Sequence, residues 1–97
     1  MVIIAKSTLT AYAAKHPEVS EALERWYQFV IKSNWGSLSE IKADFASVDY
    51  VGSDRYVFNV KGNHYRLVAL IHFSVRTVYV RFIGTHKEYD KINVQTV

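Results

Sequence analysis

Apolar residues recur with different periods in the two halves of the chain, and this difference predicts the order of its secondary structure. Up to about residue 45 they recur at helical spacing. From Arg55 onward apolar and polar residues alternate, which is typical of strands with one buried face. The pattern therefore predicts helices followed by a sheet, as in an α+β fold.

The first part of the chain predicts a short strand and two helices that meet at a proline. Residues 2–5 are apolar and mostly β-branched, which indicates a short buried strand. Ser7 or Thr8 can cap a helix that ends at Pro17, because the residue before a proline is disfavoured in the helical region. A second helix then runs to about Lys32 and should bury an apolar stripe composed of Val19, Ala22, Leu23, Trp26 and Val30.

A third, short helix is predicted by a capping box. Ser37 and Glu40 have the S-x-x-E spacing of this motif, and the helix should extend to about Phe45. Residues 47–54 mix turn formers with apolar residues, which predicts a loop with one short strand. Trp26 and Trp35 are expected in the core, because an aromatic ring on an apolar face is usually buried.

Gly62-Asn63 lies between two alternating segments and predicts a β-hairpin. A two-residue loop there sets Asn59 opposite Arg66, and this register separates the side chains into two faces. The core face should contain Phe58, Val60, Tyr65, Leu67, Ala69, Ile71 and Phe73. The open face should contain Val57, Asn59, Lys61, His64, Arg66, Val68, Leu70 and His72.

The next strand, residues 77–83, should continue both faces. Val78, Val80 and Phe82 are assigned to the core face, and Thr77, Tyr79, Arg81 and Ile83 to the open face. Arg81 is then expected near Val68 or one step further along, on the same face as Arg66 and Asn59. Gly84 should end the strand.

The segment after Gly84 predicts a short C-terminal helix. Thr85 and Glu88 form a second capping box. His86 and Tyr89 are three residues apart and should share a helical face, with Lys91 on the following turn.

Composition indicates one folded domain, residues 1–97, without disulfides. The chain contains no cysteine, and its first apolar run is too short for a signal peptide, so we expect a cytoplasmic protein without a membrane segment. The net charge is +3 and is unevenly distributed. Residues 1–49 carry five Lys or Arg against six Asp or Glu, whereas residues 50–97 carry seven against three. A basic half rich in aromatic residues favours a polyanionic partner.

Several chemistries lack their motifs. No phosphate-binding glycine loop, zinc-ligand spacing or nucleophile elbow is present, so we expect no cofactor and no metal. What remains is arginine, histidine, tyrosine and lysine, which suits metal-free RNA cleavage by the neighbouring 2′-hydroxyl. Each residue taken alone also has a structural explanation, such as a cap for Thr85 or stacking of Arg81 on Tyr79. Their convergence on one face favours the chemical interpretation.

Three segments carry a resemblance to a known family. FNVKGNHYRLVALIHF (58–73), VYVRFIGTH (78–86) and EYDKI (88–92) resemble the HigB family of bacterial toxins, which lies within the RelE superfamily. EIKADFASVDYVGSDRYVFN (40–59) and the two N-terminal helices are similar as well, so the resemblance extends over essentially the whole chain. The positions that match its motif are Asn63, Arg66, Arg81, Thr85, His86, Glu88, Tyr89, Asp90 and Lys91.

The resemblance implies a toxin of a type II toxin–antitoxin pair, an mRNA interferase that acts on the translating ribosome. It also implies a HigA-like helix-turn-helix antitoxin and a RelE-like fold, a curved, mainly antiparallel sheet with the N-terminal helices on one face. The expected catalytic residues are Arg66, Arg81, His86 and Tyr89. The expected RNA-binding residues are Asn59, Lys61, His64, Lys87 and Lys91. The alternative is a non-catalytic module that binds RNA or protein through the same basic face.

Overall fold

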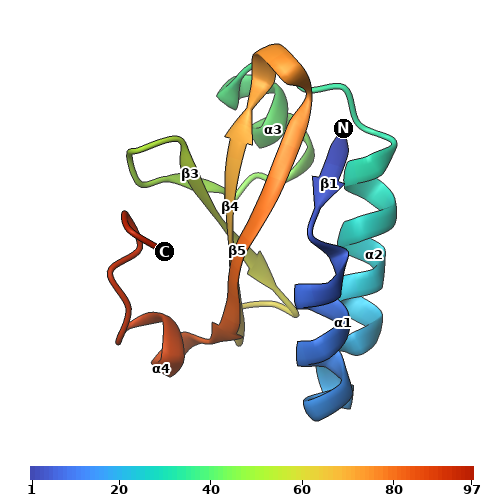
Figure 1. Cartoon of the computed structure of the whole chain (residues 1–97), viewed down its shortest axis with the longest axis vertical. Helices are drawn as coiled ribbons and strands as arrows, with labels where there is room; N and C mark the ends of the chain where they lie inside the picture. The colour runs from blue at the N-terminus through green and yellow to red at the C-terminus, as the bar shows by residue number, and fades with distance from the viewer.

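One five-stranded sheet organises the structure, a computed structural model that describes residues 1–97 (Figure 1). The strands are β1 (Val2–Ile4), β2 (Asp49–Tyr50), β3 (Arg55–Val60), β4 (Tyr65–His72) and β5 (Thr77–Thr85). The helices are α1 (Lys6–Lys15), α2 (Ser20–Ile31), α3 (Leu38–Asp44) and α4 (His86–Tyr89), with 3₁₀ turns η1 (Pro17–Val19) and η2 (Phe73–Val75).

The sheet is mainly antiparallel. Its strand order is β1-β5-β4-β3-β2, and only the β1–β5 pair is parallel. Helix α1 packs against β5 and α2 against β3, and Figure 1 shows these two helices side by side, with the short α4 on the other side of the sheet. The predicted α+β class, with N-terminal helices on one face and a short C-terminal helix, is confirmed. No helix is long and apolar enough to cross a membrane.

Aromatic side chains form the centre of the core between the helices and the sheet. Phe58 is 1% exposed and packs edge-on against Trp26 and Phe45, with ring centroids 5.5 and 5.3 Å away. Trp35 stacks on the same ring at 6.2 Å. The predicted burial of both tryptophans is confirmed, at 4% exposed for Trp26 and 2% for Trp35.

The predicted β3–β4 register is confirmed. Asn59 pairs with Arg66 and Val60 with Tyr65 across the hairpin. The predicted two-residue loop is instead a four-residue connection, Lys61 to His64, because the pairing ends at Val60 and Tyr65. The His64 N–H donates to the Lys61 carbonyl oxygen at 3.4 Å, and Lys61 and Gly62 have φ angles of +52° and +66° in the left-handed region.

A β-bulge in β5 overturns part of the predicted face assignment. Val80 pairs with Ala69 and Phe82 with Val68, so Arg81 is the extra residue between the two pairs. Beyond a bulge the alternation of side chains reverses. Ile83 therefore joins the core at 7% exposed, while Phe82 lies beside Tyr89 with ring centroids 6.5 Å apart. The prediction that Phe82 faces the core and Ile83 the open face was wrong.

Two predictions at the start of the chain were also wrong. β1 is an edge strand rather than a buried one, because it pairs only with β5 and leaves Val2 57% and Ile4 47% exposed. Helix α1 begins without a side-chain cap, since the residue before it is Ala5. The prediction that Gly84 ends its strand was wrong as well, because β5 continues through Gly84 to Thr85. A Cβ at Gly84 would lie 2.6 Å from the Phe82 ring, so any larger residue there would force this ring to move.

The core predicts a graded response to loss of an aromatic ring. Phe58→Ala should lower the free energy of unfolding by about 3–5 kcal/mol in a urea titration, because it leaves a cavity among three rings. Phe29→Ala, at a ring that is 46% exposed, is the control and should cost less than half as much. Equal losses for the two variants would contradict this description of the core.

Candidate functional site

A pocket of about 330 Å³ opens on the face of the sheet opposite α1 and α2. It is lined by Ser47, Val48, Asp49, Val57, Asn59, Arg66 and Tyr89. Polar side chains with hydrogen-bonding groups form most of its wall, and we call it the Arg66 pocket.

Strand pairing brings three of these side chains to the same face. Asn59 and Arg66 are direct partners across β3 and β4, and Asp49 is the direct partner of Val57 across β2 and β3. Val57 and Asn59 are two residues apart on β3, so they point to the same side. Asp49, Asn59 and Arg66 consequently converge in the Arg66 pocket.

The Arg66 guanidinium keeps most of its donors free. Its Nη1 atom donates to the carbonyl oxygens of Asn63, at 3.0 Å, and Tyr65, at 3.4 Å. Arg66 takes part in none of the structure's ion pairs. An arginine held at one nitrogen, with the rest of its fork unused, is suited to bind the oxygens of a phosphate.

Tyr89 enters the Arg66 pocket from α4. Burial is the main cause that raises the pKa of Tyr89 above its ordinary value, and the negative charge of Asp49 raises it further. The positive charge of Arg66 acts in the opposite direction. The Tyr89 hydroxyl is therefore protonated at neutral pH and can donate a proton or a hydrogen bond.

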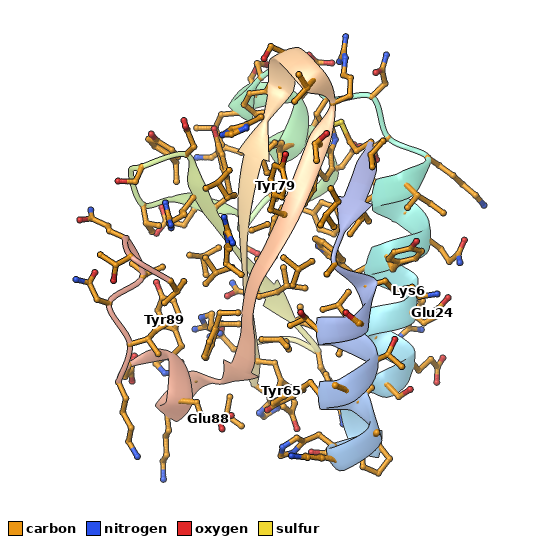
Figure 2. All side chains as sticks on the ribbon, viewed as in Figure 1. Lys6, Glu24, Tyr65, Tyr79, Glu88 and Tyr89 are labelled. Carbon is orange, nitrogen blue, oxygen red and sulfur yellow. The ribbon has the colours of Figure 1, made fainter.

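Hydrogen bonds at its N-terminus and from helix α1 hold α4 in place. The predicted capping box is confirmed: the Thr85 hydroxyl accepts from the Glu88 backbone N–H at 3.1 Å, and Glu88 Oε1 accepts from the Thr85 N–H at 2.8 Å. Tyr12 of α1 donates to the same Oε1 at 3.0 Å, and the His86 N–H donates to the carbonyl oxygen of His64. Figure 2 shows Glu88 on the side of α4 nearer to Tyr65, with Tyr89 on a different side. These bonds fix the direction in which Tyr89 projects.

The bond from the Thr85 N–H is the main cause that lowers the pKa of Glu88, and the Tyr12 hydroxyl adds to it. The carboxylate is therefore ionised at neutral pH, where it accepts hydrogen bonds from α1 and from the start of α4.

Arg81 does not line the Arg66 pocket. It is exposed at the bulge, level with Val68 and thus roughly 7 Å along β4 from Arg66. Its guanidinium carbon lies 5.8 Å from the centre of the Tyr79 ring, and it makes no ion pair or hydrogen bond. The predicted position near Val68 is confirmed, and it leaves Arg81 available to a ligand that extends beyond the pocket.

His86 is also outside the Arg66 pocket. Its side chain is 53% exposed and its Nδ1 atom lies 3.0 Å from Asp90 Oδ2. Of the two expected catalytic residues on α4, only Tyr89 lines the pocket that contains Arg66.

The remaining predicted residues separate into two groups. Lys87 on α4 and Lys91 just after it are exposed and take part in no ion pair. Lys61 donates from Nζ to the carbonyl oxygen of Glu18 at 2.9 Å, so its predicted position on the open face was wrong. The positive φ of Lys61 turns it toward the helices. His64 lies near it, in a separate recess shared with Tyr65 and Thr85.

Asp49 and Ser47 line the Arg66 pocket but were missed by the sequence analysis, which named neither as a site residue. The sequence does contain a signal for Asp49, the turn-forming residues Gly52, Ser53 and Asp54. All three have positive φ in the structure, and the tight turn that they make pairs β2 with β3 and sets Asp49 opposite Val57. Nowhere in residues 1–97 do three or more His, Cys, Asp or Glu side chains form a group that could hold a metal.

Comparison with known proteins identifies the family. Residues 19–92 match HigB_toxin, the RelE-like toxic component of a toxin-antitoxin system. The mRNA interferase toxin HigB of Escherichia coli K12 is 36% identical over 93 residues, which cover 93% of this chain and 88% of that protein. The mRNA interferase HigB of Shigella flexneri has the same identity and coverage. The mRNA interferase HigB of Escherichia coli O6:H1 is 31% identical over 94 residues, or 95% of this chain and 91% of that protein.

The chain belongs to the HigB toxin family, as its motifs predicted. The match extends from the end of η1 to the residues just beyond α4. It therefore includes β2, β3, β4 and α4, the elements that form the Arg66 pocket.

The electrostatics of the Arg66 pocket predict opposite shifts for two variants. Arg66→Gln should raise the pKa of Tyr89 further, because it removes a cation that favours the phenolate. Asp49→Asn should lower it, because it removes an anion that opposes the phenolate. The pKa can be followed by NMR with ¹³Cζ-tyrosine, and the Tyr89 signal is assigned from its loss in Tyr89→Phe. No shift in either variant would contradict the proximity of these three groups.

The anchoring of α4 predicts a pH-dependent loss of stability. A carboxylate with a lowered pKa contributes stability above its ordinary value of 4.5, and this is lost as the pH falls through the lowered pKa. Glu88→Gln should therefore be less stable than wild type at pH 7, and the difference in free energy of unfolding should shrink below pH 4.5. Tyr12→Phe should reproduce part of the loss. A difference that stays constant from pH 3 to pH 7 would contradict the role of Glu88.

Proposed function

We propose that this protein is an endoribonuclease that cuts mRNA without a metal ion, as the toxin of its toxin–antitoxin pair. The observation that carries the proposal is the convergence of a free guanidinium fork, Arg66, and a protonated phenol, Tyr89, in one pocket on the open face. The curated relatives named above are mRNA interferases, which agrees with this chemistry.

The proposed reaction uses the ribose 2′-hydroxyl as nucleophile. Its oxygen bonds to the adjacent phosphorus, the bond from phosphorus to the 5′-oxygen breaks, and the products are a 2′,3′-cyclic phosphate and a 5′-hydroxyl. Arg66 stabilises the non-bridging oxygens, where negative charge increases in the transition state. Tyr89 gives its proton to the departing 5′-oxygen. Asp49, the carboxylate of the Arg66 pocket, accepts the proton of the 2′-hydroxyl.

The surrounding cations suit a longer stretch of RNA. Arg81 lies along β4 from the pocket, and Lys87 and Lys91 are exposed on and just after α4. Each contact of this kind with a phosphate adds affinity that falls with salt concentration. Asn59 offers an amide within the Arg66 pocket for hydrogen bonds to a base edge.

The alternative function is binding of RNA or protein without cleavage. Two of the four predicted catalytic residues, Arg81 and His86, lie outside the pocket, and this separation is the observation that favours the alternative. Salt-sensitive RNA binding without cut RNA, on ribosomes or free, would distinguish it from the nuclease.

Partner and cellular location follow from the family resemblance. A toxin of a toxin–antitoxin system has an antitoxin partner. We infer that this partner is a HigA-like helix-turn-helix protein, that cleavage takes place on translating ribosomes, and that the protein acts in the cytoplasm.

Induction of the protein alone should arrest growth and leave mRNA cut at discrete positions, detected by primer extension. Arg66→Ala should lower the cleavage rate about 100- to 1,000-fold, the loss typical of one transition-state donor. Tyr89→Phe should lower it about 100- to 10,000-fold, the usual contribution of a general acid. His86→Ala and the control Lys15→Ala, at an exposed position on α1, should stay within about threefold of wild type.

These comparisons require that each variant is expressed at the wild-type level and is as stable as wild type in urea. Full toxicity of both Arg66→Ala and Tyr89→Phe would contradict the proposed site. A loss of cleavage in His86→Ala alone would identify His86, instead of Tyr89, as the proton donor.

A further inference from the structure

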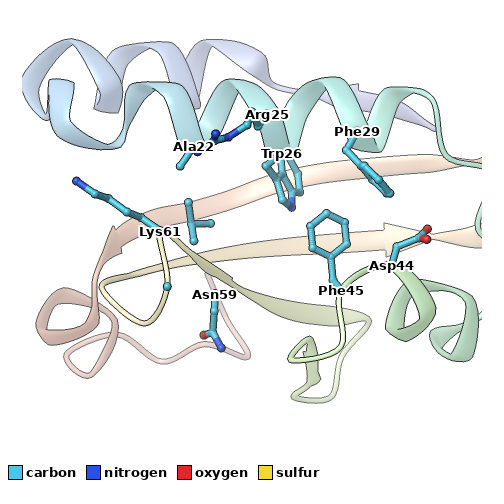
Figure 3. Close-up of a pocket in the computed structure, with 10 residues that line it drawn as sticks. Ala22, Arg25, Trp26, Phe29, Asp44, Phe45, Asn59 and Lys61 are labelled. Carbon is cyan, nitrogen blue, oxygen red and sulfur yellow. The ribbon is translucent and has the colours of Figure 1, made fainter.

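A second cavity lies on the helical side of β3, away from the Arg66 pocket. It has a volume of about 390 Å³ and runs between α2 on one side and β3 with the residue after α3 on the other (Figure 3). We call it the Trp26 groove, and its walls include Ala22, Arg25, Trp26, Phe29, Phe45 and Lys61.

Aromatic rings form the floor of the Trp26 groove. Phe29 and Phe45 pack edge-on with centroids 5.3 Å apart, and Figure 3 shows the Trp26 ring directed from α2 toward the sheet. Phe29 is nevertheless 46% exposed, although nearly all of Trp26 is buried. The groove therefore presents rigid apolar surface to a molecule that docks over Phe29. A neighbouring recess continues along α2 past Phe29 and ends at Lys32.

The indole nitrogen of Trp26 has no hydrogen-bond partner. It is the one buried side-chain nitrogen or oxygen without one in residues 1–97. Trp35, by contrast, donates from Nε1 to Asp44 Oδ2 at 2.9 Å. A buried donor without an acceptor is costly, because nearly all such groups are satisfied in native proteins. Because this nitrogen is closed off from solvent, a partner in the groove contacts the apolar rings and not the donor.

The charges at the rim of the groove favour an anionic partner. Arg25 and Lys61 border it, and the carboxylate of Asp44 already accepts from Trp35. Arg25 pairs with Glu21 at 3.3 Å, but both side chains are more than 70% exposed, and exposed pairs of this kind exchange at little cost. A carboxylate on a partner can therefore bind Arg25 and Lys61.

We propose that the Trp26 groove is the docking site for an acidic, amphipathic segment of the antitoxin. The inference depends on the proposed function, because it assumes that the antitoxin binds this chain. One apolar side chain of the segment packs among Trp26, Phe29 and Phe45. A carboxylate of the segment binds Arg25 and Lys61. A second copy of this chain fits less well, since its net charge is +3 and it would bring further positive charge.

The Trp26 groove and the Arg66 pocket lie on opposite faces of one strand. Val60 and Asn59 both border the groove, but Asn59 is the direct partner of Arg66, and Figure 3 shows its side chain directed away from α2. Substitutions on the groove side should therefore separate docking from cleavage. They should leave the toxin active but no longer neutralised.

The experiment titrates the protein encoded by the reading frame beside this chain's gene into variants made in a Tyr89→Phe background, by calorimetry. Phe29→Asp and the double variant Arg25→Glu, Lys61→Glu should each weaken binding at least tenfold. The controls Val75→Ser, at an apolar residue that is 59% exposed on η2, and Lys15→Glu should change affinity less than twofold.

Unchanged affinity in Phe29→Asp and in the double variant would overturn the proposal, as would no binding to the Tyr89→Phe parent. A dimer of the free protein in sedimentation that Phe29→Asp dissociates would overturn it too, because a second copy would then occupy the groove. Toxicity is scored separately with Tyr89 intact. If wild type is not toxic but Phe29→Asp still loses partner binding, docking stands and the nuclease function fails.

Discussion

The register of the β3–β4 hairpin is the constraint on which the rest of the structure depends. Pairing Asn59 with Arg66 directs Phe58 and Leu67 toward the helices and leaves Asn59 and Arg66 on the opposite face. A shift by one residue would expose aromatic rings and bury a guanidinium, so burial of the core fixes the composition of the Arg66 pocket. The same pairing that stabilises the protein thus also positions Arg66, the side chain that we propose binds phosphate.

Besides the hairpin register, the Arg66 pocket depends on the orientation of α4, a helix too short to be stable alone. Its capping box and the Tyr12 hydroxyl converge on one carboxylate, that of Glu88, and these bonds connect α4 to α1 across the end of the sheet. Tyr89 therefore projects into the Arg66 pocket from a helix that depends on both layers of the fold. The docking proposed for α2 and the chemistry proposed for Tyr89 belong to opposite faces of the same sheet.

Local signals were enough to predict the α+β class, the hairpin register and the capping box at Thr85, because each depends on residues close in sequence. The β5 bulge was not predictable in this way. No glycine or proline marks Arg81, and the bulge is visible only when Val80 and Phe82 are paired with β4. Asp49 was missed because its place in the pocket depends on a two-residue strand, and Lys61 because a positive φ reversed its side chain.

The proton transfer from Tyr89 to the leaving group is the central claim, and a modified substrate tests it directly. An RNA whose scissile 5′-oxygen is replaced by sulfur releases a thiolate, which needs no acid. The account predicts that Tyr89→Phe cleaves the all-oxygen RNA at least 100-fold more slowly than wild type but the sulfur-substituted RNA within about fivefold of it. An equal loss on both substrates would contradict the role of Tyr89 as the general acid.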